Sequence, residues 1–195
     1  GLQQSLVKER TRRFGPSQVS LLLRPSGHVG GDLVGFFPAG DAHVALFAID
    51  VSGHGVASAL MTARLSGHLT ADLPDRNLAL TEGPDGTPAI RPPPEVAERL
   101  NAISLEEMST DKYFTLVFAE VALETGRVRL VQAGHPHPVV QRADGALEQV
   151  GCGGVPVGLI DGAGFDEACF TLAPGDRLLI VSDGITECEA PGGMM

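Results

Sequence analysis

The sequence predicts an α+β fold built on antiparallel sheets, and three observations support this prediction. About eight short segments are continuously apolar or alternate apolar and polar residues, which is typical of β-strands. Most of these segments are joined by brief turns rich in glycine, proline and aspartate, and turns this short connect antiparallel neighbours. Only two segments repeat apolar residues at helical spacing, so two helices are expected to cover the sheets from outside.

The composition is that of one folded domain. Of the 195 residues, 43% are hydrophobic and 19% are charged, and a chain of this length can bury a sizeable core. The net charge of −10 argues against nucleic acid as a partner, because binding to a phosphate backbone requires a basic face. Since the chain has no apolar run as long as a membrane span and no signal peptide, we expect a cytoplasmic protein with no membrane partner. The three cysteines, Cys152, Cys169 and Cys188, lack metal-ligand spacing and are expected to be free thiols.

The N-terminal segment differs from the rest of the chain. Residues 3–14 are polar with a basic end and are expected to form a short helix. This helix is either a solvated surface element or the end of a linker from an upstream domain. We therefore place an N-terminal helix or linker at residues 1–16 and the main domain at residues 17–195. In the main domain, residues 19–24 predict the first strand.

The next two strands form a hairpin that brings two aspartates together. Asp32 begins a strand over residues 33–37, and an apolar strand over residues 43–49 ends at Asp50. The turn between them is centred near Asp41, so Asp32 and Asp50 should lie opposite each other. Like charges in directly opposed positions destabilise a sheet. Either one carboxylate is protonated or a cation lies between them.

A third aspartate, Asp183, follows an apolar strand over residues 177–182. A single aspartate at the end of a strand is more often a turn or helix-cap residue. Three aspartates in matching positions instead favour a cluster of oxygen ligands, which suits a hard divalent cation. The sequence therefore predicts a metal site made by Asp32, Asp50 and Asp183.

Two segments show helical periodicity. Residues 56–73 have a wide apolar face that should pack on the sheet carrying Asp50. A second helix begins near Pro94 and places Val96, Leu100 and Ile103 on one stripe. Residues 74–94 between the helices are rich in glycine and proline, and a loop of this length is typically functional or mobile.

The C-terminal half is predicted to be mostly strands. The last two should pair with each other through the turn at residues 174–176. The glycine-rich loop at residues 151–158 lacks the strand-to-helix context of a nucleotide-binding loop. The expected strands cover residues 113–123, 127–133, 139–142, 146–150, 165–172 and 177–181.

The histidines near these motifs allow two interpretations. His54 could protonate a leaving group or could cap the start of the first helix, and we favour the structural role. His135 and His137 are interleaved with prolines, which favours a rigid turn over a metal site. Ser52, His54 and Asp50 are too close in sequence to align as a catalytic triad.

Six short motifs in order carry a family resemblance. Together they resemble the metal-dependent serine/threonine protein phosphatases (PPM, or type-2C-like), and more narrowly the bacterial branch that includes SpoIIE-like and RsbU-like regulators. The resemblance covers residues 19–187. The motifs are Gly30-Gly31-Asp32, Asp50-Val51-Ser52-Gly53-His54-Gly55, Ala133-Gly134-His135-Pro136, Gly154-Val155-Pro156-Val157-Gly158, Gly175-Asp176-Arg177 and Ser182-Asp183-Gly184.

The resemblance implies a fold and a set of ligands. The fold would be a four-layer αββα sandwich, with two antiparallel sheets flanked by helices and a two-metal centre at one edge. Asp50 matches the bridging metal ligand, and Val51 would contribute a backbone carbonyl. Asp32 and Asp183 match acidic residues of the same centre, so these four residues would hold two Mn²⁺ or Mg²⁺ ions.

The sequence departs from the family pattern in three places. The family has a further metal-binding aspartate after the motif at residues 182–184, and none matches it up to Met195, so we expect an incomplete C-terminal end. Leu33-Val34-Gly35 stands where an aromatic pair and an aspartate often follow the first motif. The phosphate-binding arginine of the eukaryotic relatives has no clear counterpart.

By resemblance, this chain hydrolyses phosphoserine or phosphothreonine on a regulatory phosphoprotein, using a water activated by two metal ions. The substrate would be an anti-anti-sigma factor of the STAS type. An upstream receiver or sensor domain would control the activity, and a homodimer is left open. The alternative is a regulatory binding module with the same fold and weakened catalysis. A weaker alternative is a dinuclear metallohydrolase that acts on small phosphoesters.

Overall fold

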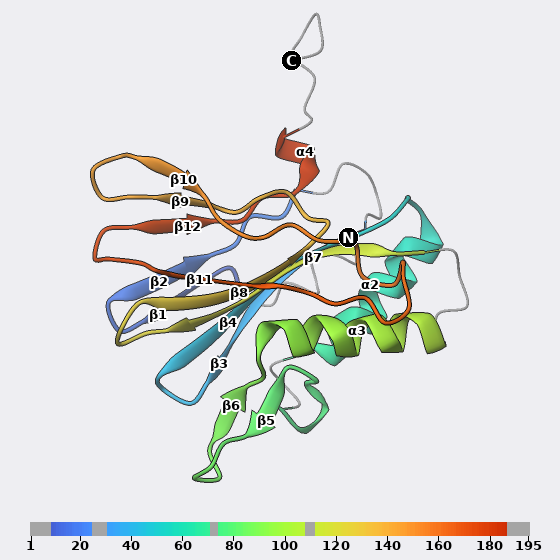
Figure 1. The fold of residues 1–195 in the computed structure, drawn as a ribbon, viewed down its shortest axis with the longest axis horizontal. Helices are drawn as coiled ribbons and strands as arrows, with labels where there is room; N and C mark the ends of the chain where they lie inside the picture. The colour runs from blue at the N-terminus through green and yellow to red at the C-terminus, as the bar shows by residue number, and fades with distance from the viewer. Residues whose placement is uncertain (1–8, 25–30, 71–73, 108–111, 187–195) are drawn as a thin grey trace, which may run out of the picture.

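The computed structural model describes residues 9–24, 31–70, 74–107 and 112–186, and it confirms an α+β fold with antiparallel sheets. A five-stranded antiparallel sheet forms the centre of the molecule (Figure 1). Its strands, in sheet order, are β11 (Glu167–Thr171), β8 (Arg127–Ala133), β7 (Phe114–Ala122), β4 (His43–Val51) and β3 (Asp32–Ala39).

The remaining elements surround this sheet. A three-stranded antiparallel sheet has the order β10 (Leu147–Gln149), β9 (Val139–Gln141) and β12 (Arg177–Leu179). Two hairpins are formed by β1 (Thr11–Phe14) with β2 (Ser17–Ser20), and by β5 (Leu80–Glu82) with β6 (Pro88–Ile90). The helices are α2 (Val56–His68), α3 (Pro93–Glu107), α4 (Asp183–Thr186) and the 3₁₀ turn η1 (Pro74–Arg76).

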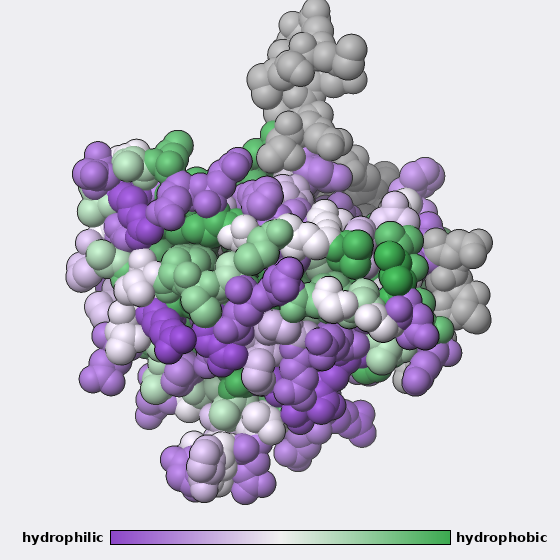
Figure 2. Space-filling model, in the orientation of Figure 1, coloured by the Kyte–Doolittle hydropathy of each residue, from purple (hydrophilic) through white to green (hydrophobic). Residues whose placement is uncertain are grey.

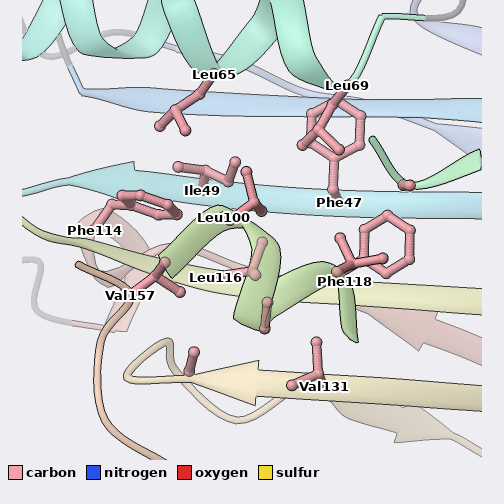
Figure 3. Packing of buried hydrophobic residues seen from close by; sticks show 14 of the residues in the cluster. Phe47, Ile49, Leu65, Leu69, Leu100, Phe114, Leu116, Phe118, Val131 and Val157 are labelled. Atoms are coloured by element: carbon pink, nitrogen blue, oxygen red, sulfur yellow. The ribbon is translucent and has the colours of Figure 1, made fainter. Parts of the chain in front are cut away.

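One face of the five-stranded sheet holds the larger core. Figure 3 shows Leu65 and Leu69 of α2 and Leu100 of α3 close to sheet residues that include Ile49 and Phe118. These five side chains are almost fully buried. The apolar face predicted for each helix therefore packs on the sheet that carries the aspartates, and burial of this area stabilises the fold.

The opposite face holds a second core. Val44, Val117 and Leu130 of the five-stranded sheet are buried there, with Leu178 of β12 and Phe14 of β1 packed against them. The two sheets therefore stack, with α2 and α3 outside the larger one. Two stacked antiparallel sheets agree with the expected sandwich. Within the described residues, however, no long helix covers the three-stranded sheet, so three of the four expected layers are seen.

The helix expected over residues 3–14 is wrong for its second half. Thr11–Phe14 is a strand that pairs with Ser17–Ser20, and Gly15 at the turn has a φ of 57° that favours glycine. The Phe14 ring packs edge-on against the Phe36 ring, with 5.9 Å between the ring centroids, and this contact fixes the hairpin to the sheet. This hairpin spans the expected boundary after residue 16, and residues 1–8 lie outside the described part.

The segment between the helices contains structure that the sequence prediction missed. The helix expected to reach residue 73 ends at His68, where Leu69 N donates to Ser66 O (3.3 Å) in a tighter turn. The loop expected over residues 74–94 contains η1 and the β5–β6 hairpin. That hairpin turns at Asp85, whose Oδ1 accepts hydrogen bonds from Thr87 N (3.1 Å) and Thr87 Oγ1 (2.6 Å).

The last two strands do not pair with each other, which corrects the prediction. β11 joins β8 in the five-stranded sheet, whereas β12 joins β9 in the three-stranded sheet. Contacts of Asp176 in the connecting turn support the pairing of β12 with β9. Its carboxylate accepts hydrogen bonds from Arg142 Nη1 (2.8 Å) and Ala143 N (2.9 Å) beside the end of β9, which anchors the turn to the second sheet.

The surface carries both hydrophilic and hydrophobic side chains. Figure 2 shows hydrophilic and hydrophobic residues interspersed over the face in view. Among the exposed apolar side chains, Val56 and Leu60 of α2 are 73% and 63% accessible. In the described part of the chain, no helix is both long and apolar enough to cross a membrane.

Candidate metal centre

The hairpin of β3 and β4 places two of the predicted ligands side by side. Asp32 and Asp50 are direct cross-strand partners, as the position of the turn predicted. On the other side of β4, Asp50 is the partner of Thr115 on β7. Side chains of direct partners project to the same face of a sheet. A row of three polar side chains therefore crosses one end of the five-stranded sheet.

Strand alternation shows which face the row occupies. Val44 lies an even number of residues before Asp50 on β4, and it belongs to the core between the two sheets. Asp50 therefore projects toward the three-stranded sheet, away from α2 and α3. Asp183 is the first residue of α4, a short way after β12 of that second sheet. The three predicted ligands therefore lie at the same end of the two sheets.

Glycine at position 31 allows the close approach that this end of the sheet requires. A Cβ at Gly31 would overlap the carbonyl oxygen of Val51, so only glycine fits without a shift of the backbone. Val51 N donates to Gly31 O (3.3 Å), and Thr62 Oγ1 of α2 donates to the same oxygen (3.0 Å). The helix therefore holds the strand end that carries Asp32 against the one that carries Asp50.

The turn after Asp50 is fixed by contacts with two other elements. The Ser52 carbonyl accepts hydrogen bonds from Ser58 Oγ of α2 (3.1 Å) and from Lys112 Nζ (3.0 Å). Ser52 Oγ accepts one from Tyr113 N (3.2 Å). His54 lies exposed on this turn, and the N-cap of α2 is Gly55 with no side-chain cap, so the expected capping role of His54 is wrong.

The electrostatics show that the three carboxylates act on one another. Burial raises the pKa of Asp50 to about 6, and the charges of Asp32 and then Asp183 add to the effect. Burial also raises the pKa of Asp32, with a further contribution from the charge of Asp183. Like charges crowded in this way favour protonation or a bound cation.

The donor set fits a hard divalent cation. The three carboxylates and the Val51 carbonyl are all oxygen donors, which Mg²⁺ and Mn²⁺ prefer. A divalent ion would also offset the repulsion that raises the pKa values of Asp32 and Asp50. Over residues 9–24, 31–70, 74–107 and 112–186, no group of three or more His, Cys, Asp or Glu side chains is close enough to hold one ion. The carboxylates therefore lie near one another but do not form a preassembled coordination site.

His135 is the residue at this site that the sequence prediction underestimated. It lies in the tight turn expected from its prolines, but its side chain is only 4% accessible, and its Nδ1 is 2.8 Å from Thr115 Oγ1. Burial lowers the pKa of His135 to about 4, so the ring is neutral. His137 is exposed, and its Nδ1 is 3.2 Å from Val150 O, so the two histidines form no joint site.

Comparisons with known proteins identify the family of this chain. The family model described as stage II sporulation protein E (SpoIIE) matches residues 40–195. The phosphoserine phosphatase RsbP of Bacillus subtilis is 24% identical over 173 residues, which are 89% of this chain and 40% of RsbP. The chain thus spans less than half the length of this relative.

Two solved structures have a similar fold. One contains the RsbU and RsbW domains of a Mycobacterium tuberculosis protein, with a TM-score of 0.67, 24% identity, and coverage of 87% of this chain and 43% of that one. The other contains the PP2C phosphatase domain and a fragment of the regulatory domain of SpoIIE from Bacillus subtilis. Its TM-score is 0.63 at 21% identity, with coverage of 82% of this chain and 42% of that one. The fold is therefore that of the PP2C phosphatases.

Proposed function

The chain belongs to the SpoIIE family, and from this premise we propose that it is a metal-dependent protein phosphatase acting on phosphoserine or phosphothreonine. The pairing of Asp32 with Asp50, with the charge of Asp183 acting on both, carries the proposal. Such a cluster is costly to keep ionised in a half-buried place unless it serves a cation. The relative RsbP is a phosphoserine phosphatase, which supports the same proposal.

Asp32, Asp50 and Asp183, with the Val51 carbonyl, would hold Mn²⁺ or Mg²⁺, and two ions are proposed for the complete centre. PP2C-type phosphatases depend on such metals. Divalent cations supply a Lewis acid for the phosphoryl oxygens and favour ionisation of the attacking water. The chain has a net charge of −10, so positive charge is needed before a phosphorylated substrate can approach the carboxylates.

The residues around the centre have separate tasks in this proposal. Lys112 and Ser58 fix the Ser52 carbonyl, which keeps the turn after Asp50 in one position. His54 is exposed on that turn and caps no helix, so its imidazole is free to return a proton to the seryl oxygen that leaves. Water attacks phosphorus directly in this scheme, with no covalent enzyme intermediate.

The substrate class is proposed to be a small regulatory phosphoprotein, such as an anti-anti-sigma factor of the STAS type. Control by an upstream receiver or sensor domain and a cytoplasmic location are part of the same proposal. The exposed apolar side chains Val56 and Leu60 lie on α2, the helix that follows the Asp50 turn. Such side chains suit contact with a partner protein or a second copy of the chain.

A second candidate is a regulatory binding module with weakened catalysis. It is favoured by one observation: the described residues contain no group of three metal-ligating side chains already close enough for one ion. Such a module would bind the phosphoprotein and release it unchanged.

The test is phosphate release from two substrates by the purified chain, after treatment with EDTA and with Mn²⁺ then added. The substrates are a STAS-domain protein phosphorylated on serine and p-nitrophenyl phosphate. We expect Mn²⁺-dependent release, with a much higher kcat/KM for the phosphoprotein. Faster turnover of the small ester would favour the metallohydrolase that acts on small phosphoesters. Binding of the phosphoprotein without phosphate release at any Mn²⁺ concentration would favour the binding module.

A further inference from the structure

His135 occupies an unusual position between the two sheets. Its side chain is 96% buried, since only 4% is accessible, and its Nδ1 is 2.8 Å from Thr115 Oγ1. Thr115 is the direct cross-strand partner of Asp50, so Thr115 lies between the His135 ring and the Asp50 carboxylate. The Nε2 atom makes no hydrogen bond of ordinary length and angle within the described part of the chain, although the Val181 carbonyl is near enough to act on the ring. A buried polar atom without a partner is rare and calls for an explanation.

Two groups of the second sheet lie near the His135 ring. The backbone carbonyl of Val181 and the carboxylate of Asp183 are both near enough to act on the ring. These two residues belong to the segment that leaves β12 of the second sheet and enters α4. The imidazole therefore contacts the sheet of Asp50 through Nδ1 and also lies near the segment that carries Asp183.

The backbone around His135 is built to hold the ring in this place. Gln132 Nε2 donates to the His135 carbonyl (2.6 Å), and Gln132 Oε1 accepts from Gly153 N (2.9 Å). Gly134 has a φ of 65°, and a Cβ there would collide with the ring of Pro156. Both features orient the turn, and neither uses the imidazole itself. Both ring nitrogens of His135 can therefore form hydrogen bonds with groups of the two sheets.

We propose that His135 is a positioning residue that fixes the distance between Asp50 and Asp183, and that it does so by joining Thr115 to the Val181 carbonyl. This inference rests on the proposed function, because it concerns the same metal centre. A neutral imidazole has one donor and one acceptor nitrogen. The Thr115 hydroxyl donates to Nδ1, and the N–H on Nε2 is directed to the Val181 carbonyl. Asp183 follows Val181 by two residues, so its carboxylate is held opposite Asp50.

The direct test is the Mn²⁺ affinity of three variants, measured by calorimetry. Changing an outer partner that orients metal ligands typically costs 10- to 100-fold in affinity. We expect a loss of this size for His135→Ala and roughly a 10-fold loss for Thr115→Val, which removes the hydroxyl at almost constant volume. His135→Gln, whose amide can still donate, should restore part of the affinity. If Thr115→Val binds Mn²⁺ as tightly as the wild type, the inference is wrong, even where His135→Ala does not fold.

A matched control separates positioning from general stability. Val128→Ala creates a cavity at a fully buried position of β8, near the opposite end of the strand from His135. It should lower the melting temperature while the Mn²⁺ affinity of the folded protein stays unchanged. If it weakens Mn²⁺ binding as much as Thr115→Val does, the effect is one of stability and the inference fails.

Nuclear magnetic resonance of the ring nitrogens gives a signature that a purely structural role would not produce. We expect the proton on Nε2 in the wild type, and a mixture of tautomers in Thr115→Val. A proton on Nδ1 in the wild type would overturn the inference. Failure of the phosphatase assay with intact Mn²⁺ binding would contradict the proposed function alone. A wild type that binds no Mn²⁺ would overturn both.

Discussion

Replacing Asp50 with asparagine separates the two roles proposed for this carboxylate, which are cation binding and repulsion of the neighbouring carboxylates. The change keeps the shape of the side chain and removes one charge from a row in which Asp32 is the direct neighbour. We expect a large loss of metal-dependent activity together with a gain in the stability of the metal-free protein. The two effects have opposite signs because the same charge binds the cation and repels its neighbours.

The magnitude of the stability effect follows from the pKa. The pKa of Asp50 rises from 3.8 to about 6, chiefly because of burial. A shift of this size is equivalent to roughly 3 kcal/mol at neutral pH. Because Asp50 is only half-buried, solvent screening reduces this figure, and we expect Asp50→Asn to stabilise the metal-free protein by about 1–2 kcal/mol.

The pH dependence of unfolding gives the sign of the stability change independently. A carboxyl group whose pKa is raised in the folded state binds its proton more tightly there than in the unfolded chain. Its contribution to stability is fully present below pH 3.8 and is lost as the pH rises through about 6. The wild type should therefore lose more stability than Asp50→Asn between pH 4 and 7.

Urea unfolding in EDTA at several pH values measures this difference, and Asp41→Asn is the matched control. Asp41 is exposed at the turn of the same hairpin, far from the other carboxylates, and should change neither stability nor activity. For activity, loss of one anionic ligand should lower kcat by at least about 100-fold, which corresponds to roughly 3 kcal/mol. Wild-type turnover of Asp50→Asn at saturating Mn²⁺ would show that Asp50 is not a ligand.

Three further predictions address the support around the centre. Gly31→Ala should destabilise the protein by about 1–3 kcal/mol because its Cβ would overlap the Val51 carbonyl. Gly67→Ala in α2 meets no neighbour and should stabilise the protein by about 0.5–1 kcal/mol. Chemical denaturation distinguishes the two variants, and equal effects would refute the overlap. Asn101→Ala removes the partners of Gly158 N and Ile160 O and should cost about 1–3 kcal/mol, so unchanged unfolding would contradict it. His54→Ala should lower kcat roughly 100-fold with unchanged stability, and wild-type turnover would remove His54 from the mechanism.

The parts of the fold that depend on local pairing could be predicted from the sequence. The pairing of Asp32 with Asp50 follows from the length of one turn, because a hairpin allows little choice of register. The burial of Leu116 and Phe118 on one face follows from their even spacing on β7, which the sequence shows. Polarity misled the prediction at the N-terminus, where the basic Thr11–Phe14 pairs as an exposed strand at the surface.

The parts that depend on distant contacts could not be predicted. The burial of His135 requires Thr115, which is 20 residues earlier, and its prolines suggested only a turn. The β5–β6 hairpin was hidden because each strand has only three residues, too few to show alternation. The first case needs a contact between segments that are distant along the chain, whereas the second is a local pairing too short to give a sequence pattern.

The proposed metal centre depends on the separation of β11 from β12. Had β12 paired with β11, it would lie at the far edge of the five-stranded sheet, four strand spacings or roughly 19 Å from β4. Asp183 would then be too far away to act on Asp50. In the structure, the contact of Asp176 with Arg142 places β12 in the second sheet, and Asp183 does raise the pKa of Asp50. The pairing of β12 with β9, supported by this ion pair and by the burial of Leu178 between the sheets, is therefore what brings Asp183 near Asp32 and Asp50.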